Sequence, residues 1–187
     1  MTPESAEQEL AKILEPGERL HWSGVPPQGL LLRGSDAFFI PFSIMWGGFA
    51  IFWETMAWTK QTPLLFKLWG IPFVLVGLYI LVGRFFVDAK MRSRMAYGVT
   101  DRRIIIRSGI LSRNVNSLAL KTLSDLTLTE RSDGTGTITF GPSYPMAYWH
   151  RGGFWPGMGG YPMAPSFESI PRAKDVYATI RQVQSAG

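Results

Sequence analysis

Two long apolar stretches, residues 37–58 and 64–87, dominate the pattern of hydrophobic and polar positions along the chain. At about 1.5 Å of rise per residue, a helix over either stretch reaches the ~30 Å thickness of the hydrocarbon core of a bilayer. Only residues 59–63 separate the two stretches, so the pattern predicts a transmembrane helical hairpin over residues 37–87. The alternative is a pair of buried helices in a soluble domain, but such helices carry a polar face and neither stretch has one.

Three charged side chains interrupt the apolar stretches: Glu54, Lys67 and Arg84. In an antiparallel hairpin Glu54 and Lys67 lie at nearly the same depth near the turn, where they either pair with each other or are solvated separately. The long stems of Lys67 and Arg84 let their charges reach the two opposite interfaces. Tryptophans at the turn end predict a belt in contact with lipid headgroups: Trp53, Trp58 and Trp69.

Lysine and arginine lie mainly outside the hairpin, on both sides of it. Lys12, Arg19 and Arg33 precede it, and Lys90, Arg92, Arg94, Arg102, Arg103 and Arg107 follow it. Because positive residues are retained in the cytoplasm, this distribution predicts that both termini are cytoplasmic and that the turn lies outside. Lys90, Arg92 and Arg94 directly follow the second stretch, so they are expected either to contact anionic lipid or to act only as a topology signal.

The segments on either side of the hairpin predict a small antiparallel sheet with helices at both ends. An amphipathic helix is expected over residues 2–14, a brief strand over 18–24, further strands over 96–100, 103–108, 125–130 and 135–140, and a closing helix over 171–185. The closing helix is expected to cap one open side of a partial barrel. The sequence thus divides into an N-terminal segment (1–36), the hairpin (37–87) and a C-terminal domain (88–187).

Residues 141–165 form an unusual insert in the C-terminal domain, rich in glycine, proline, methionine and aromatic residues. This composition predicts neither a regular helix nor a central strand. The insert is interpreted as a disordered loop, an aromatic flap on the membrane or a docking surface. Its His150 and Arg151 lie among aromatic residues, but no basic strip accompanies them, so we expect no nucleic-acid partner.

Composition narrows the possible chemistry. The chain of 187 residues contains no cysteine, which excludes disulfides, thiolate metal sites and cysteine nucleophiles. We find no paired catalytic carboxylates, no phosphate-binding loop followed by lysine and no HExxH motif, and therefore predict no enzyme, cofactor or metal site. The first twenty residues lack an apolar secretory signal, so the first helix is expected to be an uncleaved anchor. The net charge of +5 suits a protein working beside anionic lipid.

Residues 97–106, followed by a glycine, resemble the opening motif of bacterial pleckstrin-homology (bPH) membrane proteins, Tyr-x-aliphatic-Thr-(Asn/Asp)-x-Arg-aliphatic. The residues that carry this resemblance are Tyr97, Thr100, Asp101, Arg103 and Gly109. Two further segments are similar to the family: residues 16–26, with Pro-Gly-Glu followed by Trp-Ser-Gly, and residues 167–180, which resemble its last strand and helix. The insert at 141–165 is longer and more aromatic than the family pattern.

The resemblance implies an α+β membrane protein, in which a two-helix transmembrane hairpin accompanies a small PH-like antiparallel β-barrel or sandwich capped by the C-terminal helix. We expect residues 96–184 to close into a seven-stranded sheet. The phosphoinositide site of eukaryotic PH domains is not implied, because the turn at 101–102, interpreted as the first strand turn, is too tight to wrap a headgroup.

The function implied is that of a non-enzymatic module of the bacterial inner membrane. Its expected partners are the lipid bilayer and an unknown protein or a second copy of the chain, with anionic lipid contacted at the cytoplasmic face. The alternatives are a membrane-associated enzyme and an accessory subunit of a transporter.

Overall fold

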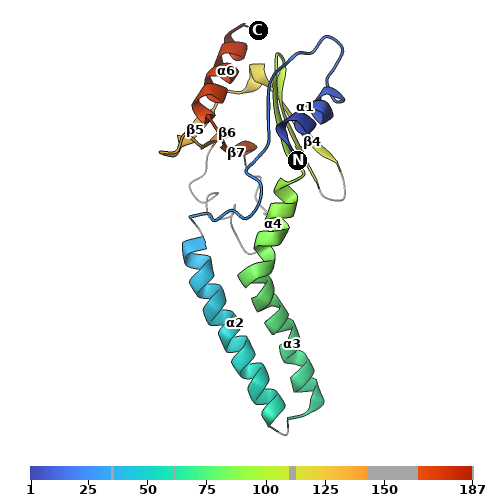
Figure 1. Ribbon diagram of the computed structural model, residues 1–187, viewed down its shortest axis with the longest axis vertical. Helices are drawn as coiled ribbons and strands as arrows, with labels where there is room; N and C mark the ends of the chain where they lie inside the picture. Colours follow the sequence, from blue (N-terminus) through green and yellow to red (C-terminus); the bar gives the residue numbers. More distant parts are fainter. Residues whose placement is uncertain (35, 61, 110–112, 143–163, 187) are drawn as a thin grey trace. The chain divides into compact units, whose positions relative to one another are not determined.

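The chain, seen as a computed structural model in Figure 1, is described at residues 1–34, 36–60, 62–109, 113–142 and 164–186. It divides into two compact units. The first unit contains Met1–Gly29 together with the described residues of Ala89–Pro145 and Pro162–Gly187, and the second is built around Leu30–Asp88. The chain therefore leaves the first unit and returns to it, so the second unit is an insertion in the first.

The first unit contains seven described strands in two antiparallel sheets (Figure 1). One sheet has the order β1-β2-β3-β4, formed by Leu20–Gly24, Ala96–Thr100, Arg103–Ser108 and Asn114–Ala119. The other has the order β5-β6-β7, formed by Leu126–Glu130, Gly136–Phe140 and Ser166–Ile170.

Two expectations about this sheet need correction. Among the described residues no strand of one sheet pairs with a strand of the other, so the fold is an open pair of sheets and not a closed barrel. Residues 96–184 also do not supply all seven strands, because β1 comes from before the hairpin and pairs with β2, with Gly24 opposite Tyr97. The turn at 101–102 is consequently the β2–β3 turn. The β1–β2 connection is the long segment that contains the hairpin.

An aromatic cluster joins the two sheets. The Phe167 ring on β7 lies 4.7 Å from that of Tyr97 on β2, 4.9 Å from that of Phe140 on β6 and 5.3 Å from that of Trp22 on β1, measured between ring centroids. Burial of such large rings is among the strongest stabilising contributions in a small domain. The alternating apolar residues of β6, Ile138 and Phe140, are fully buried in the same core, as their period of two predicts.

Two helices flank the sheets. Helix α1 (Pro3–Ala11) is capped by the Thr2 side chain, and its Leu10 packs so closely on β2 that a Cβ on Gly98 would lie 3.1 Å from it. Helix α6 (Ala173–Ala186) buries its Val176 and Ile180 in the core, which confirms the predicted amphipathic closing helix. A short 3-10 turn, η2 (Leu120–Thr122), connects the sheets.

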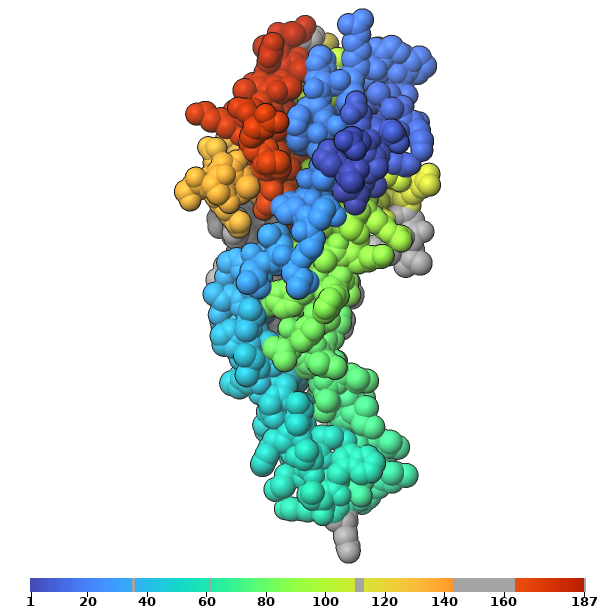
Figure 2. All heavy atoms as spheres, viewed as in Figure 1, coloured from blue at the N-terminus to red at the C-terminus, as the bar shows by residue number. Residues whose placement is uncertain are grey.

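The second unit contains the predicted hairpin. Helix α2 (Asp36–Thr59) is followed by α3 (Leu64–Leu78), a π-helical turn η1 (Tyr79–Gly83) and α4 (Arg84–Arg92), and the last three form one continuous helix. Figure 2 shows α2 and α3 lying against each other. Many large apolar side chains of both helices are exposed. The helices approach closely where glycines meet, because a Cβ on Gly77 would lie only 3.1 Å from the Cα of Gly47.

Both helices of the hairpin are long and apolar enough to cross a membrane. The apolar window of Asp36–Thr59 is only 22% buried, and that of Leu64–Arg92 only 17%. A core helix of a soluble domain buries most of its apolar side chains, and these helices expose theirs. The second helix also continues to residue 92 where the sequence pattern predicted an end at 87, which places Lys90 and Arg92 on the helix.

Candidate functional site

The family-motif residues form a buried network around Glu18. The Arg103 guanidinium donates from Nε to Glu18 Oε1 at 2.9 Å and from Nη2 to Glu18 Oε2 at 2.8 Å, a bidentate pair. Thr100 Oγ1 donates to the same carboxylate at 2.7 Å, and the backbone N–H of Glu15 donates to it at 2.8 Å. The Glu18 side chain is completely buried. This network ties the segment before β1 to the β2–β3 turn.

The charge of Glu18 is strongly stabilised. Burial by itself would raise the pKa of this carboxyl group, but the hydrogen bonds from Arg103, the Glu15 backbone and Thr100 outweigh burial and hold the pKa at about 2, well below its usual 4.5. The carboxylate is thus ionised at every physiological pH. A carboxylate in this state serves as a fixed anchor for Arg103 and not as a proton donor.

The remaining motif residues also have structural roles. Asp101 Oδ1 accepts from the backbone N–H of Arg19 at 3.0 Å, which continues the link between the N-terminal segment and the turn. Tyr97 is buried in the aromatic core. Gly109 follows β3 with φ 124, a left-handed conformation that favours glycine. The motif therefore holds the fold together and does not outline a ligand cavity.

The three predicted lipid-contacting cations have different environments. Arg92 is buried, with 2% of its surface exposed, and its guanidinium donates to the backbone carbonyls of Pro27 and of Gly29, the latter at 2.8 Å. Lys90 and Arg94 are exposed. Arg92 therefore stabilises the segment that follows β1, and the prediction of lipid contact now applies to Lys90 and Arg94.

Two ion pairs join the ends of the hairpin helices. Arg84 Nη2 lies 2.8 Å from Asp36 Oδ1, and Arg33 Nη2 lies 3.2 Å from Asp88 Oδ1. Arg84 is 3% exposed, with its guanidinium 4.5 Å from the ring centroid of Phe85. We expected Arg84 to extend to an interface, but it is held inside the hairpin because Asp36, one residue before the first apolar stretch, supplies a counter-charge.

At the turn end of the hairpin the charged side chains meet a tryptophan. Glu54 Oε1 accepts from the indole N–H of Trp58 at 2.6 Å, and Lys67 Nζ lies 5.3 Å from the centroid of the same ring. Trp58 thus lies between two residues that we expected either to pair directly or to be solvated separately. The other carboxylate oxygen of Glu54 fills the space beside Gly70, where a Cβ would lie 1.6 Å from it. The belt tryptophans Trp53, Trp58 and Trp69 are all exposed.

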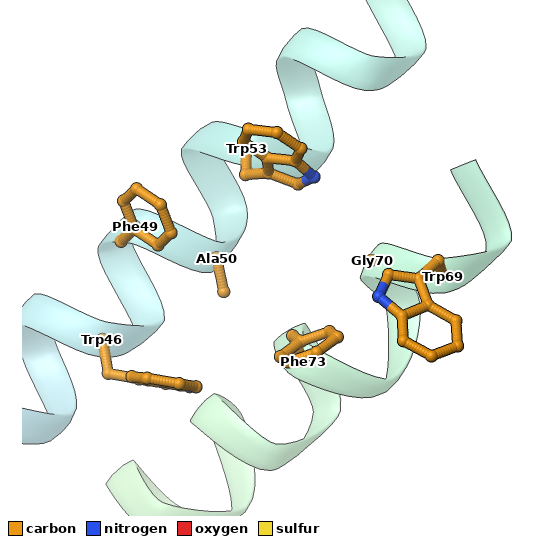
Figure 3. A pocket seen from close by; sticks show the side chains of 7 residues that line it. All are labelled: Trp46, Phe49, Ala50, Trp53, Trp69, Gly70 and Phe73. Carbon is orange, nitrogen blue, oxygen red and sulfur yellow. The ribbon is translucent and has the colours of Figure 1, made fainter. Parts of the chain in front are cut away.

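A cavity of about 340 Å³ lies between α2 and α3 (Figure 3). It is lined by Trp46, Phe49, Ala50, Trp53, Trp69, Gly70 and Phe73. In Figure 3 Ala50 and Phe73 point into the space between the helices. These walls suit a hydrocarbon chain and carry no acid, base or metal ligand.

Sequence reasoning missed the partners of the arginines: Glu18 for Arg103, Asp36 for Arg84 and Asp88 for Arg33. A usable signal was present for the hairpin, because an acidic and a basic residue stand before the first apolar stretch (Arg33, Asp36) and at the end of the second (Arg84, Asp88). No such signal links Glu18 to Arg103, which lie on opposite sides of the hairpin. In the part of the chain that the structure describes, no group of three or more His, Asp or Glu side chains could hold a metal ion.

The class of protein is defined by its two antiparallel sheets, its C-terminal helix and the motif network. The family model of the bacterial PH domain matches residues 39–184. The chain therefore belongs to the bacterial PH domain family, and membership of this family indicates a non-catalytic module. No curated protein matches the chain, and no solved structure matches it either.

Proposed function

We propose that this protein is a non-catalytic binding module that its helical hairpin anchors in the bacterial inner membrane, with the PH-like unit on the cytoplasmic side. One observation carries the proposal: β1 and β2 are paired neighbours, although residues 25–95, including the whole hairpin, separate them. The chain therefore returns to the place it left. Both ends of the hairpin lie on one side of the bilayer, together with both sheets and both termini.

The exposure of the hairpin supports the membrane as its environment. Large apolar side chains such as Leu65 (74% exposed) and Trp69 (67% exposed) cover α2 and α3. Monomeric soluble proteins rarely expose a contiguous apolar surface of more than a few hundred Å². In a bilayer the same side chains meet hydrocarbon, and a helix satisfies most of its interior backbone groups by its own hydrogen bonds.

Charge supports the cytoplasmic side. The exposed Lys90 and Arg94 follow the hairpin directly, and each cation beside an anionic leaflet contributes about 1 kcal/mol of attraction. The turn carries Lys60 alone, and the positive-inside rule therefore favours the turn outside. The exposed surface of the PH-like unit then faces cytoplasmic partners, while the bilayer fixes its position.

Cysteine labelling tests the anchor and its orientation without interference, since the chain contains no cysteine. Thr59→Cys and Ser185→Cys place a thiol near the turn and near the C-terminus, both at exposed positions. We expect the protein in the membrane pellet after ultracentrifugation. A membrane-impermeant maleimide should label Thr59→Cys in spheroplasts, and Ser185→Cys only after permeabilisation. Recovery of the protein in the supernatant would refute the anchor, and labelling of Ser185→Cys in intact spheroplasts would refute the orientation.

A further inference from the structure

The outer strand β4 differs from the other outer strands of the two sheets. It pairs with β3 along all six of its residues without a bulge, and no other described strand pairs with it. All its residues except Leu118 are exposed, including Val115 at 42%. Its sequence, NVNSLA, contains no charged residue and no proline.

Proteins protect outer strands because an unpaired row of backbone N–H and C=O groups recruits other strands. The other three outer strands here have such protection. Strand β1 carries a register shift between Leu20 and Trp22 and has α1 packed on it, and β5 ends in Glu130. Strand β7 has a register shift on its partner and a left-handed residue, Ser169, with φ 48. Among the outer strands that the structure describes, only β4 offers a regular, uncharged edge.

The charged residues that flank β4 determine which partner strands can pair with it. Arg113 precedes the strand and Lys121 follows it, and both are exposed. A partner strand running along the edge therefore meets an uncharged central stretch with a positive charge at each end. Opposite charges across a strand pair favour pairing, and like charges oppose it.

From these observations we infer that the β4 edge binds an extended segment of a partner protein by strand addition, and that this segment has an uncharged, β-forming centre flanked by acidic residues. The inference rests on the proposed role as a binding module and names the class of partner. A second copy of the chain fits less well. Antiparallel self-pairing centred on Asn116 places Arg113 diagonally across from Lys121 of the second copy, which sets like charges together.

A synthetic peptide of about nine residues, alternating Thr and Val between terminal Asp residues, serves as the probe, since at ~3.3 Å per residue it reaches from Arg113 to Lys121. Binding is measured by fluorescence anisotropy with the full chain in neutral phosphatidylcholine nanodiscs. Hydrogen exchange on the same complex locates the contact. We expect the acidic peptide to bind and to slow amide exchange in Asn114–Ala119. The same peptide N-methylated at alternate residues, which removes backbone donors, should not bind.

Charge reversal provides the specificity control. Arg113→Glu combined with Lys121→Glu should weaken binding of the acidic peptide by about tenfold and favour a peptide with Lys at both ends. Lys174→Glu on α6 changes charge at an exposed position of another element and should leave binding unchanged.

Three results would overturn the inference: no protection of Asn114–Ala119 at millimolar peptide, equal binding of the N-methylated peptide, or equal effects of the β4 and α6 charge reversals. Disulfide-linked dimers of Asn116→Cys or Ser117→Cys would show that the β4 edge binds a second copy of the chain. That result would refute the inference of a partner segment flanked by acidic residues. None of these results affects the labelling test of the membrane anchor, so the two proposals fail separately.

Discussion

Replacing Glu18 by Gln should destabilise the PH-like unit by about 3 kcal/mol at neutral pH. The folded pKa of about 2 lies roughly 2.5 units below the usual 4.5, and each unit corresponds to ~1.4 kcal/mol. Glutamine keeps the shape of the side chain but removes the charge that accepts from Arg103 through two hydrogen bonds. The loss therefore measures how strongly this network joins the N-terminal segment to the β2–β3 turn.

The pH dependence has a defined sign. A carboxyl group whose pKa is lowered by folding contributes its full stabilisation above the unfolded pKa, near 4.5, and loses it as the pH falls towards the folded pKa, near 2. The wild-type protein should lose this stabilisation across that window. The Glu18→Gln variant has no such group to protonate. The difference in stability between the two proteins should therefore shrink as the pH falls from 4.5 to 2.

Hydrogen exchange by mass spectrometry on the full chain in nanodiscs measures the effect. Peptides covering β2 and β3 report opening of the sheet, and comparison of the two proteins at one pH cancels the intrinsic exchange rates. Glu15→Gln is the matched control, because Glu15 is 57% exposed and lies 3.4 Å from Arg103 Nη1. Such an exposed pair contributes less than about 1 kcal/mol. Equal costs for the two variants, or a Glu18→Gln cost that stays constant from pH 7 to pH 3, would refute the reasoning.

Three further predictions concern the hairpin and its insertion. Arg84→Met should lower the free energy of unfolding of the hairpin by about 3–5 kcal/mol, because Asp36 is then buried without its partner. Adding Asp36→Asn should restore much of this stability. Far-UV circular dichroism during SDS titration measures both effects. Gly77→Leu should separate the helices at Gly47 and lower the SDS midpoint, whereas Leu78→Ala, at an exposed position, should not. A protein joining residues 1–29 to 89–187 through a flexible linker of about eight residues should give a dispersed NMR spectrum of a folded sheet, whereas residues 88–187 alone should not, because they lack β1 and Glu18.

Hydrophobic periodicity predicted the elements that depend on local sequence. The apolar stretches gave α2 and α3, the period of two gave β2, β3, β5 and β6, and the helical spacing of Val176 and Ile180 gave α6. Strand β4 was missed because polar residues occupy both of its faces, so NVNSLA shows no alternation. The strand forms there because β3 supplies hydrogen-bond partners along its whole length, and that information lies outside the strand itself.

The contacts of the charged residues were harder to predict, since they depend on which segments meet. Arg84 lies near the end of the second apolar stretch and Arg92 follows it, positions typical of cations at a membrane interface, and both are nevertheless buried against protein partners. The Thr100, Asp101 and Arg103 motif was recognised as a family feature, but its role became visible only when Glu18 was found beside it. Sequence spacing carries no information about a contact between residues separated by a whole hairpin.

The insertion of the hairpin between β1 and β2 explains why so many charged contacts gather on either side of it. Bringing together the ends of a flexible connection as long as residues 25–95 costs about 4 kcal/mol of chain entropy. The packing of the two hairpin helices offsets much of this entropy cost, since the helices lie antiparallel and bring the ends of the connection near each other. The ion pairs Arg84–Asp36 and Arg33–Asp88 fix those ends, and Arg92 holds the segment after β1 beside the end of α4. Strand β1 pairs with β2, and the ion pair between Glu18 and Arg103 ties the segment before β1 to the β2–β3 turn.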